Sequence, residues 1–308
     1  MRIAYLIKCH TAPAQVNRLI QALGVSGPDD SVDFYVHVDK KSVVAPHIMR
    51  ADNIFFMEGP DRVNVKWGQI SSVEATLALL RTALRSGKGY DYFWHLSGQD
   101  YPIKSNAEIF AFFRKYHGKN FMKSFGPESP DYPLFLKRNE TWYPQWMVHP
   151  QTAVRVLRRL YDLVTGGQRR TFRFFKRRRT PLAGLTALRG DGPAVYFFGE
   201  RWFAITAACA SFILDYLDKN PAYHAFFKGT FVPDECYFLT LVLNSPFRQE
   251  VWDYLCYMDW TEQKRTCKTL RVGDYKPIIR SRYFIARKFD EAVDFEILDM
   301  LDKFNRGE

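Results

Sequence analysis

The sequence contains few of the short motifs by which an active site is usually recognised. Its 308 residues include no P-loop, no GxGxxG, no HExxH and no GxSxG. Nothing therefore indicates a nucleotide-hydrolysing, dinucleotide-binding, zinc-protease or serine-hydrolase site of those types. The five cysteines are odd in number and form no CxxC pair. With no export signal, this usage predicts reduced thiols in a cytoplasm and argues against a zinc site.

Long hydrophobic runs are also missing. No apolar stretch reaches the roughly 18 residues needed to span a bilayer. The start of the chain is too short for the hydrophobic part of a signal peptide and is interrupted by Lys8. We therefore expect residues 3–7 to form a buried first strand, and the protein to be cytoplasmic.

What is present is ample apolar material and an excess of positive charge. Hydrophobic residues make up 47% of the chain and aromatic residues 16%, enough for a large core in one α/β domain or two coupled lobes. The net charge of +11 favours anionic partners: nucleotides, nucleic acid or a membrane surface. Much of the excess lies within residues 155–179, where only Asp162 opposes the arginines and lysines.

The first hundred residues alternate between strand and helix patterns. Strands are predicted at 3–7, 32–38, 54–57 and 92–96, and helices at 14–23 and 71–84. This alternation predicts an α/β fold with a mostly parallel, doubly wound sheet, in which ligands bind beyond the carboxyl ends of the strands. Three of those ends carry polar residues, at 9–10, 39–41 and 97–100.

Beyond residue 105 the pattern is less regular, and no internal repeat or linker is evident. The predicted elements are a loop at 127–133, a short element at 281–286, an extended basic insert at 166–192, and helices at 106–116, 150–164, 204–217 and 295–304.

The tripeptide Pro233-Asp234-Glu235 places two adjacent carboxylates between a proline and the apolar run 237–243. Proline restricts the backbone, so the motif predicts a helix start with Asp234 as the N-cap and Glu235 in the first turn. A carboxylate held beside backbone N–H groups and apolar side chains can serve as a general base. From the motif alone, a capping aspartate with a solvated neighbour is the simpler interpretation.

Another absence concerns metal binding. Many nucleotide-sugar transferases hold a divalent metal on the diphosphate with an Asp-x-Asp pair, which this chain lacks. Side-chain cations must then neutralise a departing diphosphate. The carboxyl-terminal region supplies cations, most of them expected on a solvated face: Lys264, Arg265, Lys268, Arg271, Lys276, Arg280, Arg282, Arg287 and Lys288.

Seven segments match a known family in order and spacing. They are IAYLI at 3–7, YVHVDKKS at 35–42, VKWG at 65–68, HLSGQDYPIK at 95–104, GERWF at 199–203, PDE at 233–235 and FIARKFD at 284–290. Together they resemble the core 2/I-branching β-1,6-N-acetylglucosaminyltransferases and peptide O-xylosyltransferases, glycosyltransferase family 14. Residues 168–191 have no counterpart in that resemblance.

The resemblance implies a GT-A-like fold, an inverting mechanism and a UDP-sugar donor bound without a metal or other cofactor. It implies that Glu235 is the catalytic base and that Asp39 meets the uracil and ribose. It also implies that Lys288 and a second basic residue grip the diphosphate, with Arg265 as the first choice and Lys268 as the second. We expect a single catalytic domain over 1–308, with a nucleotide-binding half (1–104), an acceptor-binding and catalytic half (105–308), and a basic insert at about 151–191.

Two aromatic residues and one acid are candidates for acceptor binding. Glu200 and Trp202 lie where relatives contact the acceptor sugar, and Trp260 could stack on a sugar face in the same region. Ordinary packing is the alternative for both tryptophans.

Four further residues carry open alternatives near the donor. Asp100 could contact donor or acceptor, or cap the loop before Pro102. His10 is expected to line the nucleotide pocket, whereas His95 is expected to be a buried histidine with satisfied ring nitrogens. Trp67 could pack under the donor, but a core position is favoured.

The basic insert predicts a second interaction. Arginines around Phe172, Phe174 and Phe175 suit an anionic membrane surface, so residues 151–179 are expected to hold the protein on the inner face of the cell membrane. No nucleic-acid-binding motif accompanies them, and no nucleic-acid partner is expected. A solvated loop without a partner is the alternative.

The predicted function is transfer of a sugar from a UDP-sugar, GlcNAc being favoured, to a hydroxyl of a glycan or lipid-linked oligosaccharide in surface polysaccharide synthesis. Xylosyl, glucuronosyl or galactosyl transfer stays open. Because the chain lacks the amino-terminal membrane anchor of the Golgi relatives, a bacterial member is expected. The alternative class is a non-catalytic basic module that binds nucleotide or membrane.

Overall fold

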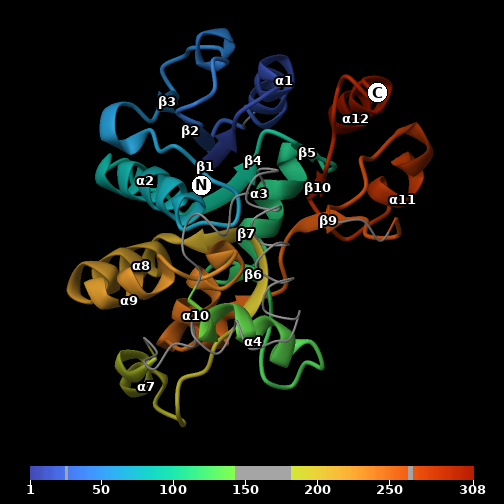
Figure 1. Cartoon of the computed structure of the whole chain (residues 1–308). Helices are drawn as coiled ribbons and strands as arrows, with labels where there is room; N and C mark the ends of the chain where they lie inside the picture. The colour runs from blue at the N-terminus through green and yellow to red at the C-terminus, as the bar shows by residue number, and fades with distance from the viewer. Residues whose placement is uncertain (25–26, 143–181, 263–265) are drawn as a thin grey trace, which may run out of the picture.

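A seven-stranded sheet organises the protein (Figure 1). The computed structural model describes residues 1–24, 27–142, 182–262 and 266–308. The strand order is β3-β2-β1-β4-β7-β6-β8. Strand β1 (Arg2–Cys9) pairs in parallel with β2 (Ser31–Val38) on one side and β4 (Tyr92–Ser97) on the other. Strand β3 (Ile54–Phe56) adds in parallel to β2.

The second half of the chain extends the same sheet. Strand β7 (Phe198–Thr206) is antiparallel to both β4 and β6 (Asn120–Phe125), while β8 (Val251–Trp252) is parallel to β6. Of these seven strands, β7 alone therefore runs against the rest, and the predicted mostly parallel α/β sheet is confirmed. A smaller sheet joins β5 (Asp100–Pro102), β10 (Ile285–Arg287) and β9 (Cys256–Met258) in the order β5-β10-β9.

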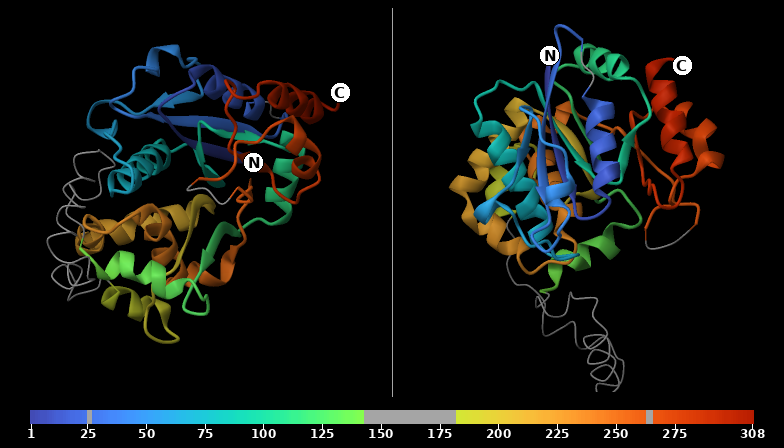
Figure 2. Two further views of the ribbon diagram at one scale, coloured as in Figure 1. Left: turned by 45° about the vertical axis from the view of Figure 1, so that its right-hand side comes forward. Right: turned by 90° about the horizontal axis from the view of Figure 1, so that it is seen from above.

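Helices cover both faces of the large sheet, as Figure 2 shows. Side chains alternate along a strand, so Tyr5 of β1 enters one core and Leu6 the other. The first core packs under α1 (Pro13–Leu23), α3 (Asn106–Lys115) and α12 (Glu296–Arg306). The second packs under α2 (Ser71–Arg85), α8 (Ala207–Lys219), α9 (Pro221–Phe227) and α10 (Tyr237–Leu243). The remaining described helices are short: α4 (Tyr132–Glu140), α7 (Ala183–Arg189) and α11 (Tyr275–Ile279).

The sequence predictions hold best in the first hundred residues. Every strand and helix predicted there is present, with ends that differ by at most two residues. The helix predicted at 204–217 is wrong at its start, because the apolar run continues from a strand into a helix without a polar break. Strand β7 ends at Thr206, whose side chain then caps α8 by accepting from the Cys209 backbone N–H at 3.2 Å.

Other boundaries differ by small amounts, and some predictions lie outside the described residues. The predicted loop at 127–133 ends where α4 begins, and the predicted helix at 295–304 is α12. The short element at 281–286 corresponds to β10. The helix predicted at 150–164 and most of the basic insert fall within 143–181, outside the described ranges. None of the helices in those ranges combines the length and hydrophobicity of a membrane span.

Gly199 marks the close approach of β6 and β7, just before Glu200. The register between these strands shifts between Met122 and Ser124. A Cβ on Gly199 would lie 2.1 Å from the carbonyl oxygen of Lys123, which is backbone and cannot yield. Glycine is therefore required here by the space between the strands.

We predict that Gly199→Ala destabilises the protein because the strands must separate locally. Overpacking of this kind costs about 1–3 kcal/mol, which lowers the midpoint of thermal unfolding by roughly 2–8 °C in a chain of this size. Circular dichroism melting measures the change. The matched control is Gly273→Ala, where an added Cβ meets nothing within 4 Å. Equal midpoints for the two variants would contradict the prediction.

Candidate functional site

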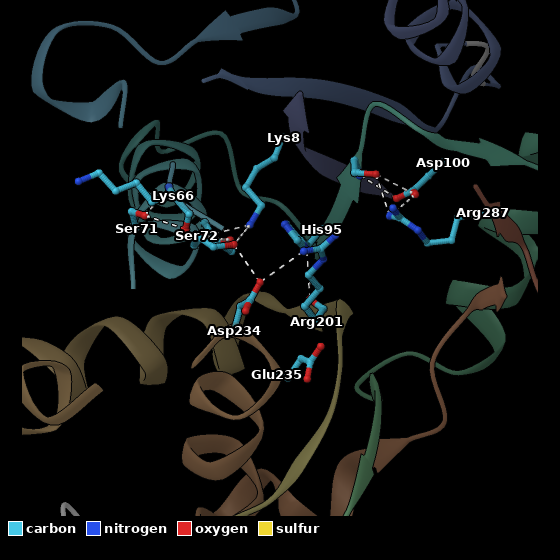
Figure 3. Close-up of polar contacts among 12 residues, drawn as sticks. Lys8, Lys66, Ser71, Ser72, His95, Asp100, Arg201, Asp234, Glu235 and Arg287 are labelled. Carbon is cyan, nitrogen blue, oxygen red and sulfur yellow. Dashed lines mark hydrogen bonds and ion pairs between the residues drawn. The ribbon is translucent and has the colours of Figure 1, made fainter. Parts of the chain in front are cut away.

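Pro233-Asp234-Glu235 forms a separate turn of 3-10 helix, η4, that packs against α2 and β7 (Figure 3). Helix α10 begins only at Tyr237, and its N-cap position is Cys236. The prediction that Asp234 caps this helix is therefore wrong. Its buried carboxylate instead accepts from Ser72 Oγ at 2.9 Å and lies 3.5 Å from Arg201 Nη1.

The chain enters this turn through a strained residue. Val232 has φ 53°, in the left-handed region that a β-branched residue rarely adopts. Its backbone N–H donates to the carbonyl oxygen of Gly68 at 2.9 Å, which ties the turn to the preceding loop of α2. The neighbouring Trp67 is 65% exposed and meets Phe231 edge-on. The favoured core position of Trp67 is therefore wrong, because the loop carries its ring outward.

The Glu235 carboxylate is half-buried and has one oxygen already bound. Arg138 Nη1, on α4, donates to Oε2 at 2.6 Å, and its guanidinium lies 4.0 Å over the ring of Phe135. Burial raises the pKa of Glu235, the charge of Asp234 raises it further, and Arg138 opposes both. The result is a carboxylate that is a stronger base than a solvated one while it remains paired.

Glu200, on β7, lies within electrostatic reach of Glu235. Its pKa is also raised by burial, against the opposing charges of Lys123, Arg201 and Arg287. The two carboxylates interact, since Glu200 adds to the upward shift of the pKa of Glu235. The structure thus joins the predicted base to the acid predicted for the acceptor side.

Asp100 lies in a different setting, with both oxygens occupied inside the protein. It is fully buried and accepts from the Ser97 backbone N–H at 2.7 Å and from Ser97 Oγ at 2.9 Å. Trp202 Nε1 donates to it at 2.7 Å and Arg287 Nη1 at 2.8 Å. These contacts fit the loop-capping alternative for Asp100 and the packing alternative for Trp202, which is itself buried.

The ends of β1 and β2 place the expected nucleotide contacts together. The backbone N–H of Asp39 donates to the carbonyl oxygen of Cys9 at 3.0 Å, and Ser42 Oγ donates to the carbonyl oxygen of His10 at 2.7 Å. The imidazole of His10 is exposed. The Asp39 carboxylate is mostly buried and accepts from Lys41 Nζ at 2.6 Å.

The two lysines predicted to bind the diphosphate differ in what their amines contact. Backbone hydrogen bonds bring the segments that contain Lys268 and Lys288 side by side. Lys268 Nζ is held by Asp274 at 2.6 Å, so its charge is already compensated. Among the described residues, Lys288 Nζ contacts a hydroxyl, that of Thr266 at 3.2 Å. Arg265 lies outside the described residues, and Trp260 is 46% exposed.

Sequence reasoning gave no individual role to several of the basic residues around the candidate site. Arg138 has no local signal, because its partner lies 97 positions away. Lys8 does have one: it is a charge directly after the buried, uncharged run 3–7 of β1. Arg287 and Arg201 also reach inward. His95 is buried as expected, and its Nδ1 contacts the carbonyl oxygen of Arg201 at 3.1 Å, but Nε2 has no hydrogen-bond partner among the described residues. The expectation of a satisfied histidine is therefore wrong for one nitrogen.

Metal ligands are not assembled in the part of the chain that the structure describes. No group of three or more His, Cys, Asp or Glu side chains there has the arrangement of a metal site. What the described residues do assemble is two interacting carboxylates, flanked by arginine and lysine, at the edge of the sheet where β1, β2 and β4 end.

Comparison with curated proteins extends over nearly the whole chain. Xylosyltransferase 2 of Rattus norvegicus is 28% identical over 330 residues, an alignment that covers 98% of this chain and 33% of that protein. Xylosyltransferase 2 of Homo sapiens has the same identity and coverage. The xylosyltransferase of Ciona intestinalis is 25% identical over 324 residues, covering 98% of this chain and 34% of that protein. The chain spans about a third of the length of the curated relatives it matches.

Solved structures give more distant likenesses. The apo form of mouse xyloside xylosyltransferase 1 has a TM-score of 0.40 and 9% identity, covering 93% of this chain and 97% of that one. The galactosyltransferase LgtC, in complex with donor and acceptor sugar analogues, has a TM-score of 0.36 and 9% identity, covering 99% and 96%. Likenesses of this size carry no functional inference.

A family model described as Core-2/I-Branching enzyme matches residues 3–155, about half of the chain. That range includes β1, β2 and β4, whose ends form the candidate site, and the curated relatives continue the match to Glu235 and beyond. The observed sheet is the mostly parallel one expected of a GT-A-like fold. Over residues 3–155 the chain is similar to the Core-2/I-Branching enzyme family, and curated relatives named xylosyltransferases extend this similarity over nearly the whole chain.

Proposed function

We propose that the protein is an inverting transferase that moves a sugar from a UDP-sugar to a hydroxyl of a glycan acceptor, with Glu235 as the general base and without a metal. One observation carries this proposal: Glu235 is a half-buried carboxylate of raised pKa, within electrostatic reach of Glu200 and beyond the carboxyl ends of the parallel strands. Sheets of this kind bind ligands at that edge.

The chemistry required of each group follows from the reaction. The acceptor hydroxyl gives its proton to Glu235 while its oxygen attacks the anomeric carbon in line, and the bond to the UDP oxygen breaks. Arg138 occupies Oε2 of Glu235, so Oε1 is the oxygen offered to the acceptor. Departing UDP gains negative charge, which fixed cations stabilise. Lys288 and Arg265 are proposed for that role, Lys288 because no carboxylate among the described residues neutralises it.

The donor sugar has two leading candidates. The sequence resemblance favours GlcNAc, whereas the curated relatives are named xylosyltransferases, so xylose is proposed beside it. The absence of an Asp-x-Asp pair supports metal-free transfer. Attachment to an anionic membrane surface through residues 151–179, a lipid-linked acceptor, and a cytoplasmic location in a bacterial cell remain proposals supported by composition and by the resemblance.

We expect slow release of UDP from one or two sugars of a panel comprising UDP-GlcNAc, UDP-xylose, UDP-glucuronic acid and UDP-galactose. Release should persist in EDTA, since side-chain cations act on the leaving group. Chromatography of UDP without acceptor measures it. Complete loss in EDTA with recovery in manganese contradicts the metal-free proposal. No release from any donor, with intact UDP binding, favours the non-catalytic alternative.

Glu235→Gln should lower turnover by about 10²–10⁴-fold, because the amide cannot accept the acceptor proton. Affinity for UDP, measured by calorimetry, should stay close to that of the wild type. Glu296→Gln, an exposed change in the first turn of α12, is the matched control. Near-normal turnover in Glu235→Gln would falsify the assignment of the base.

Arg138→Gln should move the acid limb of the kcat/KM pH profile to higher pH. Arg138 holds the pKa of Glu235 down against burial and Asp234, so its removal lets Glu235 take up a proton at higher pH and lose activity sooner as pH falls. A shift of about half a unit or more is expected. Lys137→Gln, exposed on the same helix, should leave the profile in place; an unshifted limb in Arg138→Gln counts against the ion pair.

A further inference from the structure

A chain of buried and partly buried contacts lies behind Glu235 and reaches it through Asp234 (Figure 3). Lys8 Nζ, at the end of β1, donates to the carbonyl oxygen of Ser72 at 3.0 Å and to its Oγ at 3.1 Å. Ser72 Oγ in turn donates to Oδ2 of Asp234 at 2.9 Å, and Arg201 Nη1 lies 3.5 Å from the same oxygen. Elements β1, α2 and β7 thus converge on the carboxylate beside the proposed base.

The contacts of Lys8 determine which way the Ser72 hydroxyl points. A serine hydroxyl has one proton to donate and lone pairs to accept, whereas an ammonium group only donates. Because Lys8 donates to Ser72 Oγ, the hydroxyl proton is available for Asp234 alone. Lys8 therefore acts on Asp234 without touching it.

The placement of Asp234 matters for Glu235 because the two carboxylates are adjacent on a turn of three residues. Asp234 is turned toward Ser72 and Arg201, and the Glu235 carboxylate is drawn apart from that network (Figure 3). The charge of Asp234 raises the pKa of Glu235. If the Asp234 carboxylate lost its contacts and moved toward Glu235, its charge would raise the pKa of Glu235 further.

We propose that Lys8 and Ser72 are positioning residues for the base: they hold the Asp234 carboxylate on the α2 side of the turn and so set both the placement of Glu235 and the charge that it experiences. This inference rests on the proposed role of Glu235. Neither residue is required to touch donor or acceptor.

The surroundings make the charge of Lys8 sensitive to pH. Four titratable or charged groups face it electrostatically, from β2, β4, β7 and η4: His37, His95, Arg201 and Asp234. Burial lowers the pKa of Lys8 to about 7, with Arg201 lowering it further and Asp234 opposing. Burial also holds the pKa of His95 well below its usual range, so that ring is neutral. As pH rises through about 7, Lys8 loses its charge and its hold on Ser72 weakens.

The test follows the titration of Glu235 itself, in ligand-free protein labelled with ¹³C at glutamate carboxyl groups. The NMR signal of Glu235 is the one that Glu235→Gln removes. Lys8→Met should raise the titration midpoint of Glu235 by about half a unit or more, and Ser72→Ala should shift it in the same direction. Asp234→Asn should lower it. In the Asp234→Asn background, Lys8→Met should have less than half of its effect, because the group through which it acts is gone.

The matched control is Lys66→Met. Lys66 is exposed, and its amine points away from Lys8 and Asp234 (Figure 3), so the midpoint should not change. An unchanged midpoint in Lys8→Met overturns the proposal, and so does a shift that is equal with and without the Asp234 carboxylate. If Lys8→Met fails to fold, as judged by circular dichroism, Ser72→Ala decides alone.

The readout separates this inference from the proposed function. The NMR titration needs no turnover, so a failure of the wild type to release UDP overturns the transferase proposal and leaves the Lys8 result standing. In an active enzyme, the acid limb of kcat/KM should move with the NMR midpoint while UDP affinity stays constant. A uniform loss of activity at every pH indicates a structural defect and overturns the positioning role.

Discussion

The pairing of β1 with β2 on one side and β4 on the other is the constraint on which the site depends. Parallel pairing brings three carboxyl ends to one edge of the sheet. The loops at these ends carry His10, Asp39 and the 97–100 turn. The loop before α2 holds the η4 turn through a hydrogen bond from the backbone N–H of Val232 to the carbonyl oxygen of Gly68. Shifting any of these strands by one residue would reverse its inward and outward side chains and dismantle this edge.

Charge compensation is the second requirement. Five carboxylates lie at or near the edge, and four have a described basic partner: Asp39 with Lys41, Asp100 with Arg287, Asp234 with Arg201, and Glu235 with Arg138. Buried carboxylates without such partners would be protonated or would destabilise the fold. Glu200 instead has cations nearby without a close pair, and burial dominates its pKa. The most completely paired acid, Asp100, supports the loop, while the two whose pKa is raised are the proposed base, Glu235, and the predicted acceptor contact, Glu200.

The family relation and the local physics support one another at Glu235. Curated relatives named xylosyltransferases align with nearly the whole chain, although the chain spans only a third of their length. The structure adds what no motif carries: one oxygen of Glu235 bound by Arg138, and a neighbour, Asp234, restrained from the opposite side by Ser72. Because of these contacts, the assignment of Glu235 as the base predicts a pH dependence that can be measured.

Local patterns were sufficient for β1 to β4 and their two helices, because alternation and helical periodicity depend on neighbouring residues alone. The local motif at 233–235 made Glu235 a candidate, whereas Asp39 and Lys288 became candidates through the family resemblance. Local patterns failed where a side chain takes its partner from a distant segment: Asp234 appeared to be a helix cap, and Trp67 a core residue. Arg138 meets Glu235 across 97 positions and Lys8 meets Ser72 across 64. Such pairings depend on how sheet, helices and turn pack together, so the chemistry around the base emerged only from the folded arrangement.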